Sequence, residues 1–382
     1  MKQLRYSITL LIICTTIYFS CRKPYNPPAI KVDNKFLVID GTLINSTDSP
    51  SVFTLSRTVR LTDSTFVSSP ETGAKVSVEG ENGDIHNFFE LPGGIYKSNP
   101  LPLNTSSKYR LKITTSSGAD YASDFVEVKQ TPPIDSITWQ QQNDVMIYVN
   151  THDPSNNTKY YRWDYSETWQ YRAPEKSELG VKNGLIFYVE DDTANQRYNC
   201  WSSDHSTEIL LGSSVALSQD VINMAPITTV PQNSVKINVR YSILVNQYAI
   251  TDKAYQYFQI LKKNTENLGS IFDAQPTQLT GNIHSVKNPS EIVIGYFTAS
   301  SVQQKRLFIN KDEVSNWNYV YPGRACDMKT IDQNPTNYLL YTYPDPEYSA
   351  YYFSGATGLV IDRVSCLDCT LQGGTNQKPN YW

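Results

Sequence analysis

Histidine, methionine and charged residues are scarce in this chain of 382 residues. It has four histidines, four methionines and 18% charged residues. No histidine lies in a His-Glu-x-x-His pattern or is paired with another at helical spacing; the four are His86, His152, His205 and His284. The sequence also lacks a Gly-x-Ser-x-Gly elbow, a P-loop and a Gly-x-Gly-x-x-Gly motif. We therefore expect a protein that is not an enzyme and that needs no cofactor and no metal.

No apolar run in the N-terminal region reaches the roughly 20 residues that a membrane-spanning helix needs. The run over residues 8–19 is shorter and follows two early cations, which is typical of a signal-peptide core. Ser20 then precedes Cys21, and a small residue before a cysteine is what the lipoprotein-processing peptidase requires. The sequence therefore predicts a signal peptide over residues 1–20 and a lipid anchor on Cys21, made of fatty acyl chains such as palmitate.

The alternative is an ordinary secretory signal in which Cys21 remains a structural cysteine. Cys14 fits an acylation site less well, because the bulky Ile13 precedes it. Removing residues 1–20 takes away two cations, so the formal net charge changes from −4 to −6. A mildly acidic chain without a block of basic residues is a poor nucleic-acid binder, and we expect no nucleic-acid partner.

The composition favours an all-β, mainly antiparallel fold. Tyrosine is abundant at 27 residues, with many Thr, Val, Ile, Asn and Ser and few Ala, Glu and Lys. Residues 21–34 form a lipidated, Pro-rich stalk. From residue 35 onward short strands alternate with Gly, Pro, Asn and Ser turns, as in Tyr109–Ile113, where apolar and charged residues alternate. We expect an Ig-like or transthyretin-like β-sandwich over residues 35–130.

The second expected domain covers residues 134–382 and is larger and β-rich, with one or two helices. Gln130-Thr-Pro-Pro133 marks the boundary, because two prolines cannot continue a central strand. The clearest strand is Val235–Val245, where apolar residues hold a period of two. A helix should begin after the N-cap Thr251 and end near two lysines, 262 and 263.

Aromatic residues cluster between Tyr160 and Tyr171. From this cluster we take Trp163, Trp169 and Tyr171 as candidates for stacking on a sugar or peptide ligand. The other interpretation is that alternation along the strand places half of the cluster in the core. Glu190-Asp-Asp192 could bind calcium, but it lacks the oxygen-ligand loop with a distal Glu, so a solvated loop is favoured.

Four cysteines remain after Cys21, and in an exported protein they predict one or two disulfides; they are Cys200, Cys326, Cys366 and Cys369. A zinc site would need a second Cys-x-x-Cys or paired histidines. The tail from Cys366 to Trp382 has little apolar surface, so a cross-link and its last two aromatic residues are expected to hold it against the body. The alternative is that the tail docks on a transporter. The pairing of the four cysteines stays open.

Several phrases of the second segment resemble a known family. They are Tyr161-Arg-Trp-Asp-Tyr-Ser-Glu-Thr-Trp, Arg240-Tyr-Ser-Ile-Leu-Val-Asn-Gln-Tyr, the run from Leu268 to His284, and the tail beginning Cys366-Leu-Asp-Cys. Together they resemble the Bacteroidota lipoprotein family catalogued as domain of unknown function 4249. The first segment resembles the carboxypeptidase-regulatory or transthyretin-like sandwich.

This resemblance implies an outer-membrane lipoprotein, often encoded beside a TonB-dependent receptor, and brings no catalytic residues. We therefore expect a non-catalytic binding or accessory module in the cell envelope that works with such a transporter. The alternative is a structural or adhesive envelope protein. Arg22-Lys23 departs from the acidic residues that often follow the acylated cysteine of surface-exposed relatives, so the face of the membrane stays open, as do the ligand and the oligomeric state.

The anchor assignment predicts the behaviour of one variant. Cys21→Ala should abolish lipid labelling and leave the protein soluble in the periplasm or as unprocessed precursor. One acyl chain binds membranes only marginally, so the several chains of a mature lipoprotein make the attachment durable. Metabolic labelling with a fatty-acid analogue measures this, and acyl labelling that persists in Cys21→Ala would contradict the assignment.

Overall fold

The computed structural model describes residues 35–59, 69–266, 279–321, 326–332, 340–341, 343–355 and 358–382. The predicted signal peptide, Cys21 and stalk lie outside these residues, as does most of the phrase from Leu268 to His284. Residues 36–382 form one compact unit, which is described below. Its fold is mainly β, with 50% strand and 12% helix, and its sheets are mostly antiparallel. No helix among the described residues is long and apolar enough to cross a membrane.

The first part of the unit is a 13-stranded sheet that encloses one core. Its main path runs β20-β9-β8-β10-β22-β1-β2-β7-β6, with β21 on β1, β3 on β2, and β4 between β5 and β8. Its strands are β1 Leu37–Ile44, β2 Pro50–Arg57, β3 Ser69–Pro70, β4 Lys75–Gly80, β5 Ile85–Asn87, β6 Phe89–Leu91, β7 Ile95–Pro100, β8 Lys108–Thr114, β9 Asp120–Ser123, β10 Val126–Lys129, β20 Ile283–Ser285, β21 Val293–Ile294 and β22 Ala299–Ser300.

The expected sandwich of residues 35–130 is not complete in itself, because three of its strands return from residues 283–300. Strand β22 inserts between β1 and β10 and is parallel to both, while β21 extends parallel to β1. Gly295 makes this close return possible. Its φ is +150°, and a Cβ there would lie 2.5 Å from the carbonyl oxygen of Ile39 in β1, so only glycine fits without strain.

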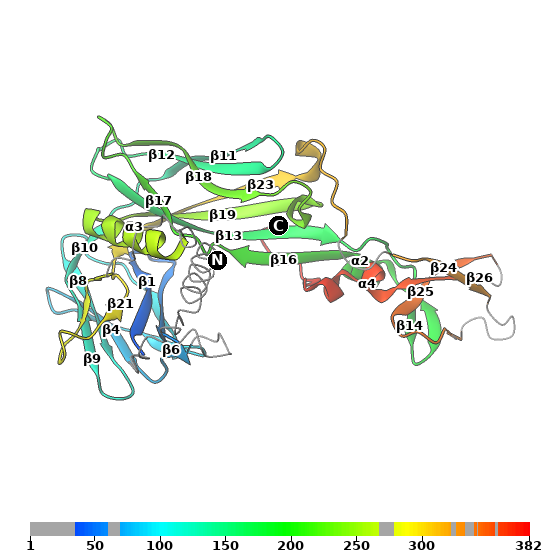
Figure 1. Ribbon diagram of the computed structural model, residues 1–382, viewed down its shortest axis with the longest axis horizontal. Helices are drawn as coiled ribbons and strands as arrows, with labels where there is room; N and C mark the ends of the chain where they lie inside the picture. The colour runs from blue at the N-terminus through cyan, green and yellow to red at the C-terminus, as the bar shows by residue number, and fades with distance from the viewer. Residues whose placement is uncertain are drawn as a thin grey trace, which may run out of the picture. The chain divides into compact units, whose positions relative to one another are not determined.

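The second part packs two antiparallel sheets face to face around a second core. Figure 1 shows the three-stranded sheet β11-β12-β18 above the sheet β16-β13-β19-β23, in which β17 also pairs with β13. The strands are β11 Ile134–Gln141, β12 Val145–His152, β13 Tyr160–Arg172, β16 Asn199–His205, β17 Leu210–Ser213, β18 Val221–Val230, β19 Arg240–Ala249 and β23 Val302–Asn310. Alternation buries every second residue of β12 and β19 in this core.

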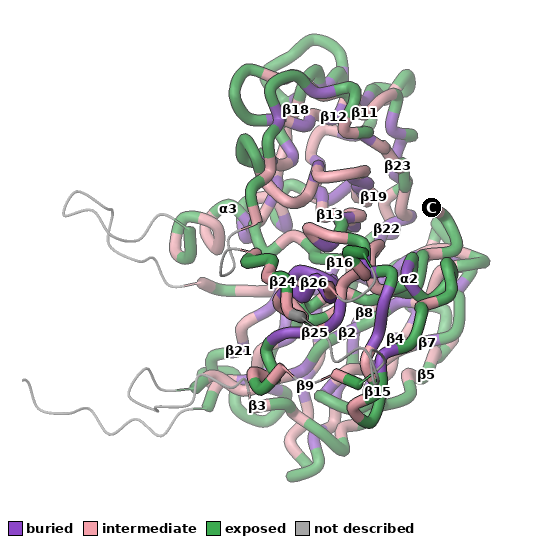
Figure 2. Tube along the Cα trace, turned by 90° about the vertical axis from the view of Figure 1, so that its right-hand side faces the viewer, coloured by how far each residue is buried: buried purple, intermediate pink, exposed green. Residues whose placement is uncertain are grey.

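A third, smaller core lies between a hairpin and a three-stranded sheet. The hairpin is β14 Leu179–Lys182 with β15 Leu185–Tyr188, and the sheet is β24 Lys329–Asp332, β26 Gly358–Arg363 and β25 Tyr348–Ser354, with β26 in the middle. The described helices are α2 Asp191–Tyr198, α3 Asp252–Glu266 and α4 Val364–Leu367, with 3-10 turns η1 Val235–Ile237, η2 Lys311–Glu313 and η3 Cys369–Gln372. In Figure 2 the buried residues follow the inner strands, and outer strands such as β5 and β15 are largely exposed.

Helix α3 agrees with its sequence prediction, whereas strand β19 begins later than predicted. Helix α3 occupies the expected position, and the Thr251 hydroxyl accepts a hydrogen bond from the Ala254 amide, as an N-cap does. The expected strand Val235–Val245 is wrong at its start. The Ser234 hydroxyl accepts from the Lys236 amide and bends the chain into η1, so β19 begins only at Arg240.

The expected boundary at Gln130–Pro133 separates two cores, but it is a packed connection. The Thr131 amide donates to the Ser301 hydroxyl at 2.9 Å, and the Thr131 hydroxyl accepts from the Ala249 amide at 2.9 Å. The side-chain amide of Gln247 donates to the Pro132 carbonyl at 2.8 Å. The prolines end strand pairing, as expected, but the polar groups around them are satisfied by residues from two distant parts of the chain, strand β19 and Ser301.

Candidate functional site

The three aromatic candidates on β13 fall in two different environments. Trp163 is 2% exposed, stacks on Tyr161 with ring centroids 5.7 Å apart and donates its indole N–H to Gln247. It is therefore chiefly a core residue. Trp169 is half-buried and Tyr171 is buried, and both line a hollow of about 400 Å³ at the other end of the strand. Of the three candidates, the structure brings Trp169 and Tyr171 together.

The hollow is mostly aromatic, and a second hollow adjoins it. Its lining residues are Trp169, Tyr171, Ser202, Val235, Tyr319, Tyr321 and Gln372. The second hollow, of about 340 Å³, shares two of these tyrosines and is lined by Arg172, Ala173, Pro174, Tyr198, Asn238, Tyr319 and Tyr321. We call the two together the aromatic groove. Its polar groups are hydroxyls, amides and one guanidinium.

Strand pairing explains the arrangement of one wall. Strand β13 pairs with β16 so that Trp169 lies opposite Ser202 and Tyr171 lies opposite Cys200. Residues directly opposite in an antiparallel pair share a face, and so do residues two apart on one strand. The ring of Trp169, the hydroxyl of Ser202 and the ring of Tyr171 therefore project to the same side of the sheet.

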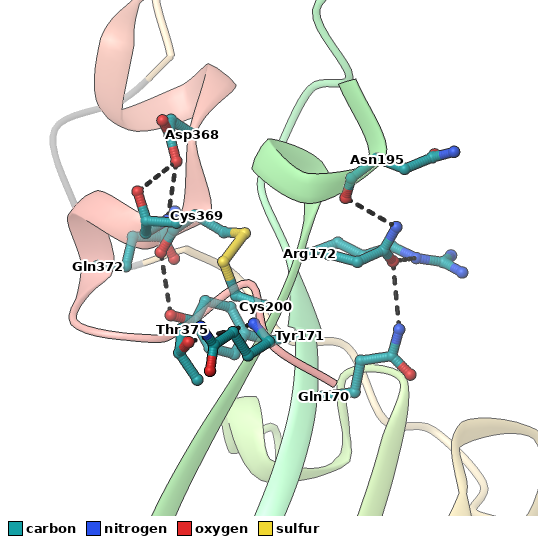
Figure 3. Close-up of a disulfide and its surroundings, with 12 residues drawn as sticks. Gln170, Tyr171, Arg172, Asn195, Cys200, Asp368, Cys369, Gln372 and Thr375 are labelled. Carbon is teal, nitrogen blue, oxygen red and sulfur yellow. Dashed lines mark hydrogen bonds between the residues drawn. A yellow bond between two sulfur atoms is a disulfide. The ribbon is translucent and has the colours of Figure 1, made fainter. Parts of the chain in front are cut away.

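A disulfide attaches the C-terminal tail to this wall. Cys200 of β16 is bonded to Cys369 of η3, and the Tyr171 hydroxyl donates to the Cys369 carbonyl at 3.0 Å (Figure 3). Trp201 and Thr375 exchange two backbone hydrogen bonds of 2.8 Å. These contacts hold Gln372, which lines the groove, close to Tyr171. The tail has few apolar residues of its own, so the cross-link and these hydrogen bonds order it.

The other disulfide joins Cys326 and Cys366, so the structure pairs all four cysteines predicted for the mature chain. The pairing left open by the sequence is therefore Cys200 with Cys369 and Cys326 with Cys366. The two cysteines of Cys-x-x-Cys bond to different partners, and neither sulfur is a free thiol available for a zinc site.

The last two residues pack on the opposite face of β13. The Tyr381 hydroxyl lies 2.8 Å from the Thr168 hydroxyl, and the Arg306 guanidinium lies 3.8 Å from the Tyr381 ring centroid. The Trp382 ring is half-buried, packs edge-on against Phe308 and donates from its indole N–H to Gln170. Trp382 thus packs as the expected aromatic anchor, whereas Tyr381 remains 42% exposed.

A buried ion pair lies beneath the groove. Glu167 shares the face of Trp169, and its side chain is 4% exposed. Its carboxylate accepts from the ammonium of Lys236 and from the Tyr241 hydroxyl at 2.8 Å. The Lys236 ammonium also lies 5.1 Å from a Trp169 ring centroid, within cation–π range. Burial, reinforced by the neighbouring carboxylate of Glu167, raises the pKa of Tyr241 well above its ordinary value. The cation and the carboxylate neutralise each other below Trp169.

The groove contains ring faces and hydrogen-bonding groups. None of the four histidines borders it, and each has a carboxylate within 4.0 Å elsewhere on the chain, for example Asp135 for His152. The lining offers aromatic stacking together with donors and acceptors from side-chain amides, hydroxyls and Arg172. Such a surface can bind a neutral ligand that has both apolar faces and hydroxyl groups.

Another hollow, of about 460 Å³, lies beside Trp163, and two of its charged groups, Arg162 and Asp164, contact each other. The guanidinium of Arg162 lies 3.7 Å from the Asp164 carboxylate and 5.0 Å from the Phe258 ring. The Asp164 carboxylate also accepts from Asn246 at 2.5 Å. Because these polar groups are committed to each other, the aromatic groove is the better candidate for a ligand site.

Residues 22–306 match the family described as "Domain of unknown function (DUF4249)", which is well over half of the chain. The chain belongs to the DUF4249 family. No curated protein matches it. A solved structure of the Yersinia pseudotuberculosis adhesin InvE is 11% identical, and the alignment covers 56% of this chain and 55% of the adhesin with a TM-score of 0.15. The chain thus spans about half the length of that adhesin, and so slight a likeness carries no argument about fold or function.

The DUF4249 match includes only part of the groove. Trp169, Tyr171 and Ser202 lie within residues 22–306, whereas Tyr319, Tyr321 and Gln372 lie beyond them. The sequence phrases predicted membership of this family for the whole mature chain. The match establishes it for residues 22–306. The C-terminal wall of the groove belongs to the part outside the match.

Sequence reasoning missed Tyr319 and Tyr321, although a signal was present. Trp317, Tyr319 and Tyr321 alternate in Trp-Asn-Tyr-Val-Tyr, a period of two that places them on one side of an extended segment. Trp317 is 1% exposed and belongs to the second core, and the two tyrosines continue from it into the groove. Gln372 gave no such signal, because its position depends on the disulfide.

The ion pair below Trp169 yields a prediction for stability. Lys236→Met leaves the buried carboxylate of Glu167 without its cation, which should lower the free energy of unfolding by about 2–3 kcal/mol. This is somewhat less than the roughly 3–5 kcal/mol typical of a fully buried pair, because the Lys236 side chain is 27% exposed. The double variant Glu167→Gln/Lys236→Met should recover most of the loss. Urea unfolding followed by tryptophan fluorescence measures both.

The matched control is Lys176→Met, which breaks an exposed pair with Asp191 at 3.5 Å and should change stability by less than about 1 kcal/mol. Equal stability of Lys236→Met and wild type, or additive losses in the double variant, would show that the buried pair has no coupling energy.

Proposed function

We propose that this DUF4249 protein is a lipoprotein of the outer membrane, anchored at Cys21, and that it is a non-catalytic binding module for carbohydrate that assists a TonB-dependent transporter. The observation that carries the proposal is the aromatic groove, whose rings are held in place by a disulfide-bonded tail and whose underlying charges cancel. The anchor is supported by the signal-like residues 1–20 and by Ser20-Cys21. The TonB-dependent transporter as a partner is supported by the family resemblance.

The chemistry of the groove favours a carbohydrate. A pyranose ring has apolar C–H faces that stack on aromatic side chains and an edge of hydroxyls that hydrogen-bond to amides and hydroxyls. The groove has Trp169, Tyr171, Tyr319 and Tyr321 for the first role, and Ser202, Asn238 and Gln372 for the second. Because Lys236 is neutralised by Glu167, Arg172 is the one remaining cation among the lining and underlying residues. The rest of the lining is aromatic or neutral and polar, and Arg172 can donate to a hydroxyl, so the groove suits a saccharide.

The disulfides agree with an envelope location. Cys200–Cys369 and Cys326–Cys366 fasten parts of the chain that are 169 and 40 residues apart. Disulfides form and persist in oxidising compartments such as the periplasm and the cell surface. A lipid-anchored protein in that compartment can hold a saccharide next to an outer-membrane transporter. This role requires affinity for the saccharide and a location beside the transporter, but no catalytic step.

The first test measures saccharide binding by the purified protein. Isothermal titration with neutral glucan, xylan, mannan and galactan oligomers should identify at least one that binds. Trp169→Ala and Tyr321→Ala should each weaken that binding about tenfold, because loss of a stacked aromatic ring costs about 1–3 kcal/mol. The matched control is Tyr188→Ala, a tyrosine that is 68% exposed and outside the groove, and it should leave binding unchanged.

Binding that is equally strong in Trp169→Ala, Tyr321→Ala and wild type would place the ligand elsewhere. The absence of binding to every oligomer would contradict carbohydrate as the ligand class.

The second test concerns the partner. When the protein is isolated from outer membrane in mild detergent, we expect a β-barrel transporter to co-purify in stoichiometric amount. The Cys21→Ala variant, expected to lack the anchor, should recover much less of it, because the membrane no longer keeps the two proteins together. Reproducible isolation of the anchored protein alone would count against the accessory role and favour the structural or adhesive alternative.

A further inference from the structure

The two disulfides lie in different surroundings. Cys200, Cys369 and Cys366 are each 0% exposed, whereas Cys326 is partly exposed. The Cys326–Cys366 bond joins the chain just before β24 to helix α4, next to the central strand β26. A thiol in solution can therefore approach Cys326 more readily than the other three sulfurs. Exchange with a thiol requires access to a disulfide sulfur, so this bond is the more open to attack.

A buried carboxyl group lies beside the same bond. Asp362, at the end of β26, is 0% exposed. One donor atom from each of Cys326, Asp362 and Cys366 lies within 4.8 Å of the others. The Oδ1 atom of Asp362 accepts from the backbone amides of Asp327 at 3.0 Å and Arg363 at 2.7 Å. Its Oδ2 atom is buried and has no hydrogen-bond partner. A buried carboxylate oxygen without a hydrogen-bond partner lowers the stability of the fold. Such an oxygen is therefore expected either to belong to a protonated carboxyl group or to take part in function.

The surroundings of Asp362 favour its protonated form. Burial raises the pKa of Asp362, the carboxylates of Glu175 and Asp327 add to this effect, and the two backbone amides oppose it. The nearby cations are engaged elsewhere, since Arg363 pairs with Glu347 at 2.6 Å and Lys329 lies 3.4 Å from Asp327. The carboxyl group therefore retains its proton to a higher pH than an exposed aspartic acid does.

We propose that Cys326–Cys366 is an exchangeable disulfide and that Asp362 supplies the proton to the departing sulfur of Cys366. A thiolate attacks the sulfur of Cys326, a mixed disulfide forms there, and the bond to Cys366 breaks. The electron pair of that bond goes to the Cys366 sulfur, which takes the proton of Asp362 and leaves a carboxylate. A second thiolate then attacks the mixed disulfide and releases Cys326 as a thiolate together with the oxidised thiol.

The reductant in this scheme is a thiol, either a small monothiol or the thiol of a partner protein in the envelope. Protonation by a positioned acid speeds such a step because it removes the developing charge on a sulfur that is buried in an apolar site. A metal ion is the other ligand that two sulfurs and a carboxylate could hold, but the two sulfurs are bonded to each other here. The proposal does not depend on the aromatic groove or its ligand.

The test follows both disulfides in the same molecule, so that Cys200–Cys369 is an internal control. The full-length lipoprotein in mild detergent is incubated with 2-mercaptoethanol, a neutral monothiol, and quenched by alkylation. Peptide mass spectrometry then measures the state of each cysteine. Cys326–Cys366 should be reduced at least about tenfold faster than Cys200–Cys369, and the mixed disulfide should be trapped on Cys326.

Asp362→Asn keeps the shape of the side chain but cannot give up a proton. It should slow reduction of Cys326–Cys366 about tenfold at a pH where the wild-type carboxyl still carries its proton, and leave Cys200–Cys369 unchanged. The difference from wild type should shrink as the pH rises through the raised pKa of Asp362, because the wild-type carboxyl has then lost its proton. The matched control is Asp124→Asn, a carboxylate whose side chain is 68% exposed in the first part of the unit, and it should leave the rate unchanged.

Three outcomes would overturn the proposal. Equal reduction of both disulfides would mean that Cys326–Cys366 has no special reactivity. A mixed disulfide on Cys366 would assign attack and departure to the wrong sulfurs. A loss of rate in Asp362→Asn that is the same at every pH would show that the side chain has only a structural role.

Discussion

The pairing of β13 with β19 determines where the important side chains of the second core lie. These two strands pair over ten residues, from Tyr161 with Ala249 to Gln170 with Arg240. Because side chains alternate along a strand, this register places Glu167, Trp169 and Tyr171 on the inner face and Thr168 and Gln170 on the outer face. A shift of one residue would bring the charged pair and the groove rings to the wrong side. The groove, the position of Glu167 beneath it and the site where the tail packs all depend on this register of β13 and β19.

Buried polar groups reinforce that register. Gln247 of β19 is 0% exposed, accepts from the Trp163 indole and donates to the Pro132 carbonyl and the Thr151 hydroxyl. One side chain thus links β19, β13, β12 and the connection between the two larger cores. A displaced strand would leave these groups buried without partners, at a cost of about 1–3 kcal/mol each. A slip of two residues would keep the same faces buried, and satisfied polar contacts of this kind distinguish the observed register from such a slip.

Local pattern was enough to predict many of the strands and helix α3 but not their connections, and it missed helix α2, which begins at Asp191 where a solvated loop was favoured. The alternation in Tyr109–Ile113 and the N-cap at Thr251 depend on neighbours in sequence, and both appear where expected. The insertion of β22 between β1 and β10 depends on residues about 170 to 256 positions apart and leaves no mark in either segment. Ser234 shows the same limit at short range, because its hydroxyl competed with an apolar period of two and delayed the start of the strand to Arg240.

The part of the candidate site that lies on strand β13 was predictable from the sequence, and the rest was not. Trp169 and Tyr171 were found because they belong to an aromatic cluster, whereas Trp163 of the same cluster proved to be a core residue because Gln247 satisfies its indole. The opposite wall comes from Tyr319, Tyr321 and Gln372, and the last of these reaches the groove through a bond between residues 169 positions apart. The sequence predicted one or two disulfides among the four cysteines but contained nothing that selects one pairing from three.

The two disulfides divide the C-terminal region into a part that is held and a part that can be released. Cys200–Cys369 has both sulfurs in fully buried residues and is surrounded by hydrogen bonds from Tyr171 and from the Trp201–Thr375 bridge, so its opening would also require the tail to separate from β16. Cys326–Cys366 fastens only the chain before β24, at the edge of a three-stranded sheet. Reduction at Cys326 would therefore loosen that edge while Gln372 stays fixed beside Tyr171. Thiol chemistry at one end of the tail and ligand binding at the other can then occur in the same molecule without interfering.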